Sequence, residues 1–235
     1  KMLEIEKNNI LLHAQLSNFA YLDTFDYAHN KVDIIKIVKK EVGCSWIFTD
    51  RLNNVHIAFR GSESIKDLLN NINMTPTPFY NDLGDVHSGY FDYYKAYRNT
   101  LIEYIFHLKK HKKLNNISTC GHSSGSLIGE MLAIDLAYLM KEKITSYSYG
   151  APPIGDSVFA KNFQSLPNLK SYKIMNEHDF VKNIPSPFVH VQKQILIRET
   201  IKDKNPKQWS LHPNRIIKDH SIKTYIRGIK KFITV

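Results

Sequence analysis

Residues 117–126 read ISTCGHSSGS, and this stretch decides the fold. It contains Gly121-His122-Ser123-Ser124-Gly125, which fits the pattern G-x-S-x-G. In that pattern the central serine occupies a sharp turn between a strand and a helix, so that its hydroxyl projects from the end of the sheet. Side chains two residues before and after the serine would collide, and glycine has none. The alternative is a flexible Gly/Ser loop, which the flanking sequence has to exclude.

The flanking sequence favours the turn. Residues 117–122 form a short run that can be a strand, and LIGEMLAIDLAYLM (127–140) is strongly helical. A phosphate loop is excluded because no G-K-[ST] follows at the required spacing. The stretch therefore predicts Ser123 as a nucleophile. It also predicts the backbone amide of Ser124, at the start of the helix, as a donor to a developing oxyanion.

Strands and helices alternate along the rest of the chain, which favours a mostly parallel sheet flanked by helices, an α/β fold. The hydrophobic periodicity predicts helices over 8–22, 32–41, 89–113, 127–140 and 219–231, and strands over 42–50, 55–60, 117–122, 144–150, 169–176 and 188–199. We find no repeat, low-complexity segment or linker, so the 235 residues are expected to form a single domain, 1–235.

A serine hydroxyl needs a base to take its proton and a carboxylate to orient that base. In this arrangement the acid and then the histidine follow the serine along the chain. Asp179 lies in NEHDFVKNIP (176–185), just after a predicted strand. Asp135 lies inside the helix predicted after Ser123, which would carry it away from the site. Asp156, Asp203 and Asp219 are the other acids after Ser123, and the later histidines are His190, His212 and His220.

His220 is the favoured base, and His212 remains the alternative. His220 is predicted to open the last helix, whose apolar stripe would hold its ring still; the stripe comprises Ile222, Tyr225, Ile226 and Ile229. His190 reads as an ordinary strand residue.

A short amphipathic helix is predicted after the strand at 55–60, directly following Ser62. Its apolar residues Ile65, Leu68, Leu69 and Ile72 recur at i, i+3, i+4 and i+7. Such a helix can be a lid that covers an acyl groove and swings away at a lipid surface. A surface helix that faces the core would show the same pattern.

Six segments in this order resemble the class 3 lipases, the family of fungal triacylglycerol lipases, over about residues 8–230. The segments are AFRGSESIKDLLNNI (58–72), VHSGYFDYYKAY (86–97), CGHSSGS (120–126), SYGAPPIGD (148–156), NEHDFVKNIP (176–185) and DHSIKTY (219–225). The resemblance implies an α/β-hydrolase fold with a Ser123–Asp179–His220 triad. It also implies that Ser62, which could equally cap the next helix, is the second oxyanion residue. The chain departs from the family pattern at Ser126, where the family often has a second glycine. It also departs at Phe180, where small residues or proline are frequent.

The resemblance implies a serine carboxylester hydrolase, a lipase that cleaves acylglycerols through an acyl-enzyme. The alternatives are a phospholipase A1 or soluble esterase on the same scaffold, and a catalytically inactive lipid-binding module. This chemistry uses no cofactor and no metal, and neither is expected. His107 and His111 lie four residues apart on a predicted helix, but no third ligand accompanies them.

Charge and cysteine content complete the expectations. The formal charge is +10, of which about +8 falls between His190 and Val235. An anionic lipid surface is the expected transient partner of this basic region, and no nucleic-acid motif is present. The two cysteines exclude a disulfide scaffold, although one bridge between Cys44 and Cys120 stays open. With no apolar leader in view and only two cysteines, an intracellular location is expected rather than secretion, although a start at Lys1 allows processing. No transmembrane segment is expected either.

Overall fold

The computed structural model describes residues 2–22, 31–62, 75–184, 186–199 and 213–234. No helix within these ranges is long and apolar enough to cross a membrane. The predicted lid residues Ile65, Leu68, Leu69 and Ile72 lie outside the described residues, as do Asp203 and His212.

One sheet carries seven strands in the order β1-β2-β3-β6-β7-β8-β9. Their bounds are Asp33–Lys40 (β1), Gly43–Thr49 (β2), Val55–Phe59 (β3), Ile117–His122 (β6), Ile144–Tyr149 (β7), Leu169–Asn176 (β8) and Gln194–Ile197 (β9). β1, β2 and β3 pair antiparallel, and the pairs from β3 to β9 are all parallel. Strands β4 (Pro76–Pro78) and β5 (Asp85–His87) form a separate two-stranded sheet. The parallel strands bring their carboxyl ends to one edge, where open α/β sheets hold their sites.

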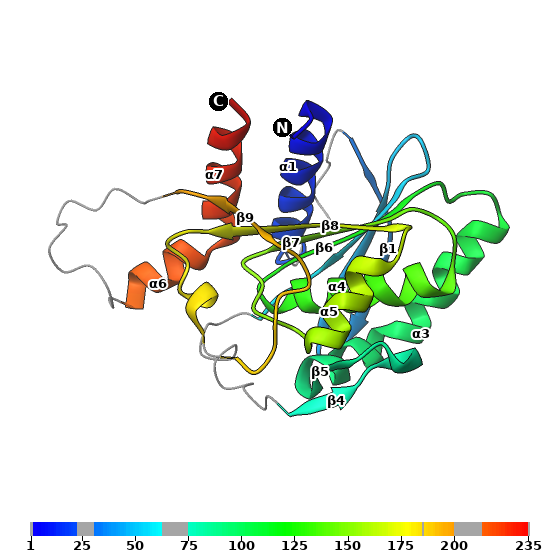
Figure 1. Ribbon diagram of the computed structural model, residues 1–235. Coiled ribbons are helices and arrows are strands. Elements are labelled where there is room, and N and C mark those ends of the chain that lie inside the picture. The colour runs from blue at the N-terminus through cyan, green and yellow to red at the C-terminus, as the bar shows by residue number, and fades with distance from the viewer. Residues whose placement is uncertain (1, 23–30, 63–74, 185, 200–212, 235) are drawn as a thin grey trace, which may run out of the picture.

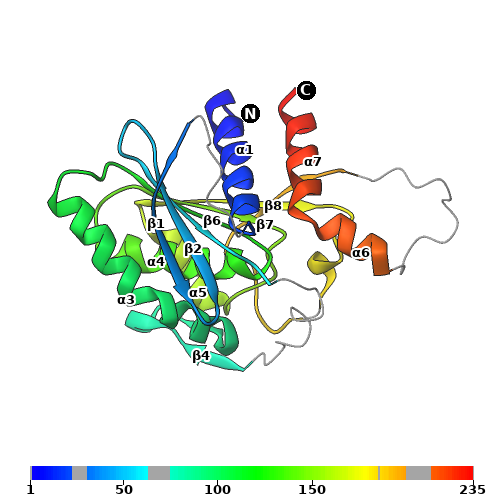
Figure 2. The same ribbon diagram turned by 180° about the vertical axis from the view of Figure 1, so that it is seen from behind.

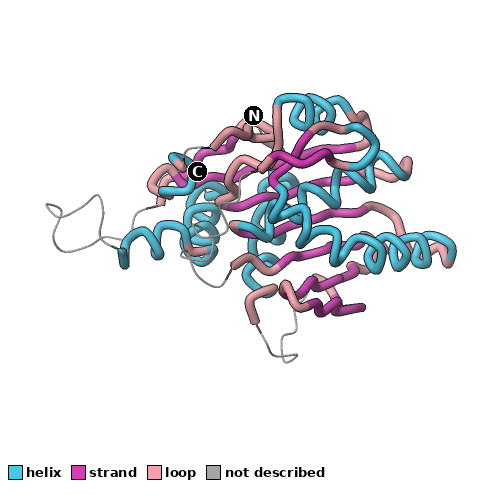
Figure 3. The backbone as a smooth tube through the Cα atoms, turned by 90° about the horizontal axis from the view of Figure 1, so that it is seen from below, coloured by secondary structure: helices cyan, strands magenta, loops and turns pink. Residues whose placement is uncertain are grey.

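Helices cover both faces of the sheet, as the alternating pattern predicts. α1 (Glu4–Phe19) and α7 (Ile222–Thr234) stand on one face, while α3 (Ser88–Lys110), α4 (Ser124–Leu139) and α5 (Ser157–Ser165) lie on the other (Figure 1 and, from behind, Figure 2). Seen from below, the strands run side by side across the molecule (Figure 3). Residues 124–137 of α4 are all buried, in keeping with a sequence that is mostly apolar apart from Glu130, Asp135 and the serines of its first turn.

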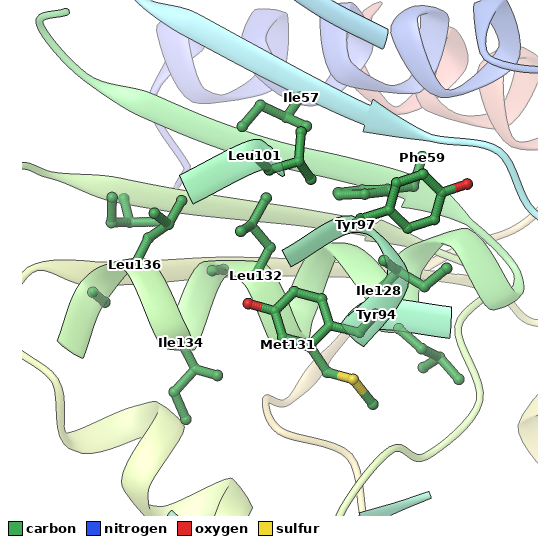
Figure 4. Close-up of a cluster of buried hydrophobic side chains, with 14 of the residues drawn as sticks. Ile57, Phe59, Tyr94, Tyr97, Leu101, Ile128, Met131, Leu132, Ile134 and Leu136 are labelled. Atoms are coloured by element: carbon green, nitrogen blue, oxygen red, sulfur yellow. The ribbon is translucent and has the colours of Figure 1, made fainter. Parts of the chain in front are cut away.

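The hydrophobic core is divided by the sheet. One cluster packs α3 and α4 against side chains such as Ile57 and Phe59 of β3 (Figure 4). The other packs α1 and α7 against Ala58 of the same strand and against Cys120. Side chains of β3 thus point alternately into the two clusters, which is typical of a central strand buried on both faces. Cys120 is buried, Cys44 is half-buried, and both are free thiols rather than a bridge.

The helix predicted for residues 32–41 is wrong, because Asp33–Lys40 form the edge strand β1. This segment is rich in Ile and Val, whose branched side chains favour extended backbone. Pairing with β2 supplies the hydrogen bonds that decide between the two structures. The lysines of β1 suit an exposed sheet edge, which charged side chains protect from pairing with another chain.

Two further predicted elements differ in extent. The strand predicted over 188–199 is confined to Gln194–Ile197, and Val189 forms only an isolated bridge with Gly155. The last helix is divided into α6 (Pro213–His220) and α7, so His220 closes one helix instead of opening another. At this break the carbonyls of Asp219 and His220 accept hydrogen bonds from the side chains of Asn176 and His122, which tie the chain to the sheet.

Candidate active site

The turn at Ser123 is strained in the way the pattern predicts. Ser123 has φ 56° and ψ −130°, between the end of β6 and the start of α4. A Cβ at Gly121 would collide with the backbone of Gly125, and one at Gly125 would collide with the backbone at Phe59 and Arg60. These two glycines therefore let the serine turn pack against β3.

Three buried side chains from distant parts of the chain meet at this turn. The His220 Nε2 lies 2.9 Å from the Ser123 Oγ, and its Nδ1 lies 2.7 Å from the Asp179 Oδ2. Ser123, Asp179 and His220 are 4%, 0% and 5% exposed. Hydrogen bonds thus connect the serine hydroxyl to the imidazole and the imidazole to the carboxylate, which is the order that activates a serine.

Asp179 is fixed on both of its oxygens. Its Oδ1 accepts the Val181 amide at 3.0 Å, so the side chain caps the short 3₁₀ helix Phe180–Asn183. Its Oδ2 accepts the Tyr225 hydroxyl at 2.5 Å in addition to the histidine. The sequence places Tyr225 only in the apolar stripe of the last helix, and this polar contact is not visible in that pattern.

Gly150 explains how the tyrosine and the carboxylate can approach each other. This residue has φ +59°, and a Cβ there would lie 2.9 Å from the Tyr225 hydroxyl and 3.1 Å from the Asp179 Oδ2. Any other residue at position 150 would have a strained backbone, and its side chain would press on the Asp179 carboxylate.

A second histidine, His122, adjoins the triad. Its Nε2 donates to the His220 carbonyl at 2.5 Å, and its Nδ1 accepts the Tyr21 hydroxyl at 2.9 Å. Burial holds the pKa of His122 well below its ordinary value, and the neighbouring His220 lowers it further. His122 is therefore neutral and holds the backbone of His220, a role that its variable place in G-x-S-x-G does not signal.

The two predicted oxyanion residues lie together beside the nucleophile. The Ser62 amide donates to the Ser124 Oγ at 2.8 Å, and the two hydroxyls are 2.9 Å apart. Gly61 makes room for Tyr21 and for the His122 carbonyl, rather than only for a substrate. Ser62, Ser123 and His220 line a cavity of about 370 Å³, which Asn18 and Tyr21 border from the end of α1.

The two departures from the family pattern have structural roles. The Ser126 hydroxyl donates to the Gly121 carbonyl at 2.6 Å and accepts the Tyr149 amide at 3.2 Å, which joins α4 to β6 and β7. The Phe180 ring packs edge-on against the His220 ring, with centroids 5.7 Å apart.

The other candidate acids and bases in the described residues have different partners. The Asp135 carboxylate binds Tyr94 and Arg98 in the core, at 2.5 Å from the nearest atom of each. Asp156 caps α5. His190 contacts Gln194 through its Nε2.

Comparison with known proteins agrees with this arrangement. Two solved structures share the fold: a Rhizomucor miehei lipase in a propeptide complex (TM-score 0.73, 22% identical, 95% of this chain and 80% of that one) and a triacylglycerol lipase whose catalytic centre is a serine protease triad (TM-score 0.75, 22% identical, 95% and 94%). The fold is that of the α/β-hydrolases. Residues 56–189 match the family model described as lipase (class 3), and the chain belongs to that family.

Three relatives show how far the sequence similarity reaches. A lipase from Rhizomucor miehei is 28% identical over 64% of this chain and 43% of its own length. A secreted mono- and diacylglycerol lipase from Malassezia globosa is 25% identical over 52% of this chain and 41% of its own length. A phospholipase A1-II from Oryza sativa is 24% identical over 75% of this chain and 48% of its own length. The matched part of the chain thus spans less than half the length of each relative.

The expected intracellular location is wrong. It is contradicted by the relatives from Malassezia, which are secreted lipases by name. The cysteine argument fails physically, because a chain of this size buries enough apolar surface to be stable without disulfides.

Proposed function

We propose that this chain is a serine carboxylester hydrolase, a lipase that cleaves acylglycerol esters. The observation that carries the proposal is the hydrogen-bonded series from Ser123 through His220 to Asp179. The family and the fold support it, and we propose that residues 1–235 form one catalytic domain around it.

The contacts define a reaction in two halves. The Ser123 Oγ attacks the ester carbonyl carbon while His220 Nε2 takes the hydroxyl proton, and Asp179 stabilises the imidazolium that forms. The tetrahedral intermediate then collapses, the alcohol leaves with the proton from His220, and an acyl-enzyme remains. A water molecule, deprotonated by the same nitrogen, hydrolyses the acyl-enzyme and restores the serine.

We propose that the amides of Ser62 and Ser124, with the Ser62 hydroxyl, stabilise the oxyanion of that intermediate. In this structure the Ser62 amide donates its hydrogen to the Ser124 Oγ. Rotation of the Ser124 side chain would make the donor available. Such preorganised donors are a large source of rate enhancement in acyl transfer.

The rim of the cavity favours a lipid substrate. Ile217 is 55% exposed at the rim, and the exposed lysines Lys218 and Lys223 flank it. We propose that this rim, as part of the basic C-terminal region, contacts anionic lipid surfaces transiently. We also retain the proposal that Ile65, Leu68, Leu69 and Ile72 form a lid that is displaced at such a surface.

One test separates a working triad from an inactive lipid-binding module. Ser123→Ala should lower ester hydrolysis by at least about 10⁴-fold and abolish labelling by a fluorophosphonate, while the urea unfolding midpoint stays near that of the wild type. Ser45→Ala is the matched control, because Ser45 is a buried serine of β2 whose hydroxyl lacks a partner in the described structure. Hydrolysis or labelling that survives in Ser123→Ala would refute the assignment.

A substrate panel decides between a triacylglycerol lipase and the second candidate, a phospholipase A1, which the similarity to the rice relative favours. Triacylglycerol, phosphatidylcholine and a short p-nitrophenyl ester are compared with the same enzyme. A steep rise in rate once the short ester exceeds its solubility would support the lid, and smooth saturation would count against it.

A further inference from the structure

Tyr21 lines the catalytic cavity, but the reaction proposed above gives it no role. It lies just after α1, outside residues 56–189 that match the family model. Its half-buried side chain lines the cavity together with Ser62 and Ser123, and its hydroxyl donates to the His122 Nδ1 at 2.9 Å. The hydroxyl is therefore placed to act on the catalytic groups through its neighbours.

On one side this hydroxyl contacts the loop that carries the oxyanion residue Ser62. The backbone amide of Gly61, the residue before Ser62, hydrogen-bonds to the Tyr21 oxygen and lowers the pKa of the hydroxyl. The packing is tight, because a Cβ at Gly61 would overlap both the Tyr21 oxygen and the His122 carbonyl. The tyrosine oxygen thus accepts from the oxyanion loop and donates to the histidine that precedes the nucleophile.

On the other side the connection continues through His122 to the catalytic base. The hydrogen bond from Tyr21 makes the His122 Nδ1 an acceptor, so the single proton of this neutral ring is on Nε2. The Nε2 donates to the His220 carbonyl at 2.5 Å. Without the tyrosine donor, a ring with its proton on Nδ1 would compete, and that ring cannot donate to the carbonyl. Tyr21 therefore selects the tautomer that holds the backbone of His220.

Tyr21 is itself held in place and keeps its proton. Phe19 and Ala20, which precede it, are 1% and 0% exposed, and its backbone amide donates to the Asn18 carbonyl at 3.2 Å. Burial raises the pKa of the Tyr21 hydroxyl, and the nearby Arg60 only partly opposes this rise. The hydroxyl is therefore a donor near neutral pH. A group that is fixed before the reaction needs no reorganisation during it.

We propose that Tyr21 is a positioning residue of the hydrolase. Its hydroxyl joins the oxyanion loop at Gly61 to the catalytic base, through His122, and holds both beside the nucleophile. The inference rests on the proposed function of the site. Because the hydroxyl places groups that stabilise the transition state, its removal should lower kcat and leave substrate binding nearly unchanged.

Tyr21→Phe tests this role, because it removes the hydroxyl and keeps the ring. On a p-nitrophenyl ester below its solubility limit, kcat should fall about tenfold while KM changes less than about twofold. A boronic acid forms a tetrahedral adduct with Ser123 that resembles the intermediate, so its Ki should rise about tenfold as well. A substitution that only loosened the fold would reduce the amount of active enzyme and leave KM and Ki unchanged. An unchanged Ki would therefore overturn the proposal.

Two further variants separate the hydroxyl from the ring and from the attachment of α1. Tyr172→Phe is the matched control: the Tyr172 hydroxyl also ties α1 to the sheet, by donating to Glu6 at 2.6 Å, but in the first turn of the helix. This variant should keep its kcat and Ki. Tyr21→Leu removes both the ring and the hydroxyl of Tyr21. If only Tyr21→Leu lost activity and Tyr21→Phe kept it, the ring would act and the proposal would be overturned.

A double-mutant cycle traces the connection through His122. In a His122→Ala background, Tyr21→Phe should lower kcat by less than about threefold, because the histidine that transmits part of the effect is absent. A full tenfold loss in that background would overturn the connection. Wild-type protein that neither hydrolyses esters nor reacts with a fluorophosphonate would refute the proposed function and this inference with it. Active wild-type protein with an equally active Tyr21→Phe variant would overturn this inference alone.

Discussion

Asp179 is held by three donors. The Tyr225 hydroxyl and the His220 Nδ1 share its Oδ2, and the Val181 amide holds its Oδ1. A buried carboxylate with these donors is electrostatically satisfied and cannot rotate freely. The orientation of the histidine is thereby fixed through the acid by a tyrosine of α7.

We expect Tyr225→Phe to lower kcat about tenfold with little change in KM. The substitution keeps the ring in the apolar stripe but removes the hydrogen bond to the Asp179 Oδ2, and hydrogen bonds to charged groups contribute about 1.5–3 kcal/mol. Steady-state kinetics on a soluble ester would measure the effect.

Tyr94→Phe is the matched control for this prediction. Tyr94 is a buried tyrosine that also donates to a carboxylate, the Asp135 Oδ2, at 2.5 Å, but in the core beneath α4. It should lose similar stability and keep its kcat. Equal losses of kcat in the two variants would mean that Tyr225 acts only through stability.

At the residue scale, the sequence could predict the catalytic side chains that a motif or their place along the chain marks. Ser123 between two glycines, Asp179 after a strand and His220 late in the chain follow from such patterns, and the structure brings all three together. The hydrogen bonds of Tyr225 and His122 could not be predicted. Tyr225 looks like one more apolar residue of the helix stripe, and His122 occupies a position of G-x-S-x-G that any residue can fill.

Elements were predictable where local pattern and tertiary environment agree. α4 is mostly apolar and buried, and the sequences of the strands around it are β-capable runs. The local pattern predicts a helix at β1, and only the pairing with β2 makes the segment extended. The break between α6 and α7 is not predictable for a related reason. The side chains that donate to the carbonyls of Asp219 and His220 belong to Asn176 and His122, more than 40 residues earlier in the sequence.

Gly129 in α4 and Gly150, just after the end of β7, should respond oppositely to replacement by alanine. Gly129 lies inside α4, where a Cβ would meet nothing closer than 3.6 Å, so Gly129→Ala should raise the free energy of unfolding by about 0.5–1 kcal/mol. Gly150→Ala should lower it by about 1–3 kcal/mol and reduce kcat, because the backbone is left-handed and the Cβ would press on Asp179 and Tyr225. Urea unfolding and ester hydrolysis measure both. Stabilisation by Gly150→Ala would contradict the geometry.

On the scale of the whole molecule, the site draws on both ends of the chain. Tyr21 follows α1, and His220 ends α6 just before α7. The helices α1 and α7 stand side by side on one face of the sheet (Figure 1). His122 connects the two ends, because it accepts from Tyr21 and donates to the backbone of His220. Its protonation would break the first of these bonds and place a positive charge beside the catalytic ring.

This arrangement predicts that the fold is sensitive to acid. The folded protein keeps His122 neutral, whereas the unfolded chain protonates it with a pKa of about 6.5. The unfolded state therefore binds more protons below that value, so stability rises with pH and is lost as pH falls below about 6.5. The loss from His122 is about 1.4 kcal/mol for each pH unit.

Urea unfolding between about pH 7 and pH 5 measures this loss, and His122→Gln isolates its source. The glutamine amide can still donate to the His220 carbonyl but does not titrate. Carboxylates and the other histidines contribute equally to both proteins, so the difference in pH slope belongs to residue 122. The variant should lose less stability over this interval, by roughly 1 kcal/mol or more. Parallel slopes would mean that His122 titrates normally in the folded protein, and the link between the two ends of the chain would then survive in acid.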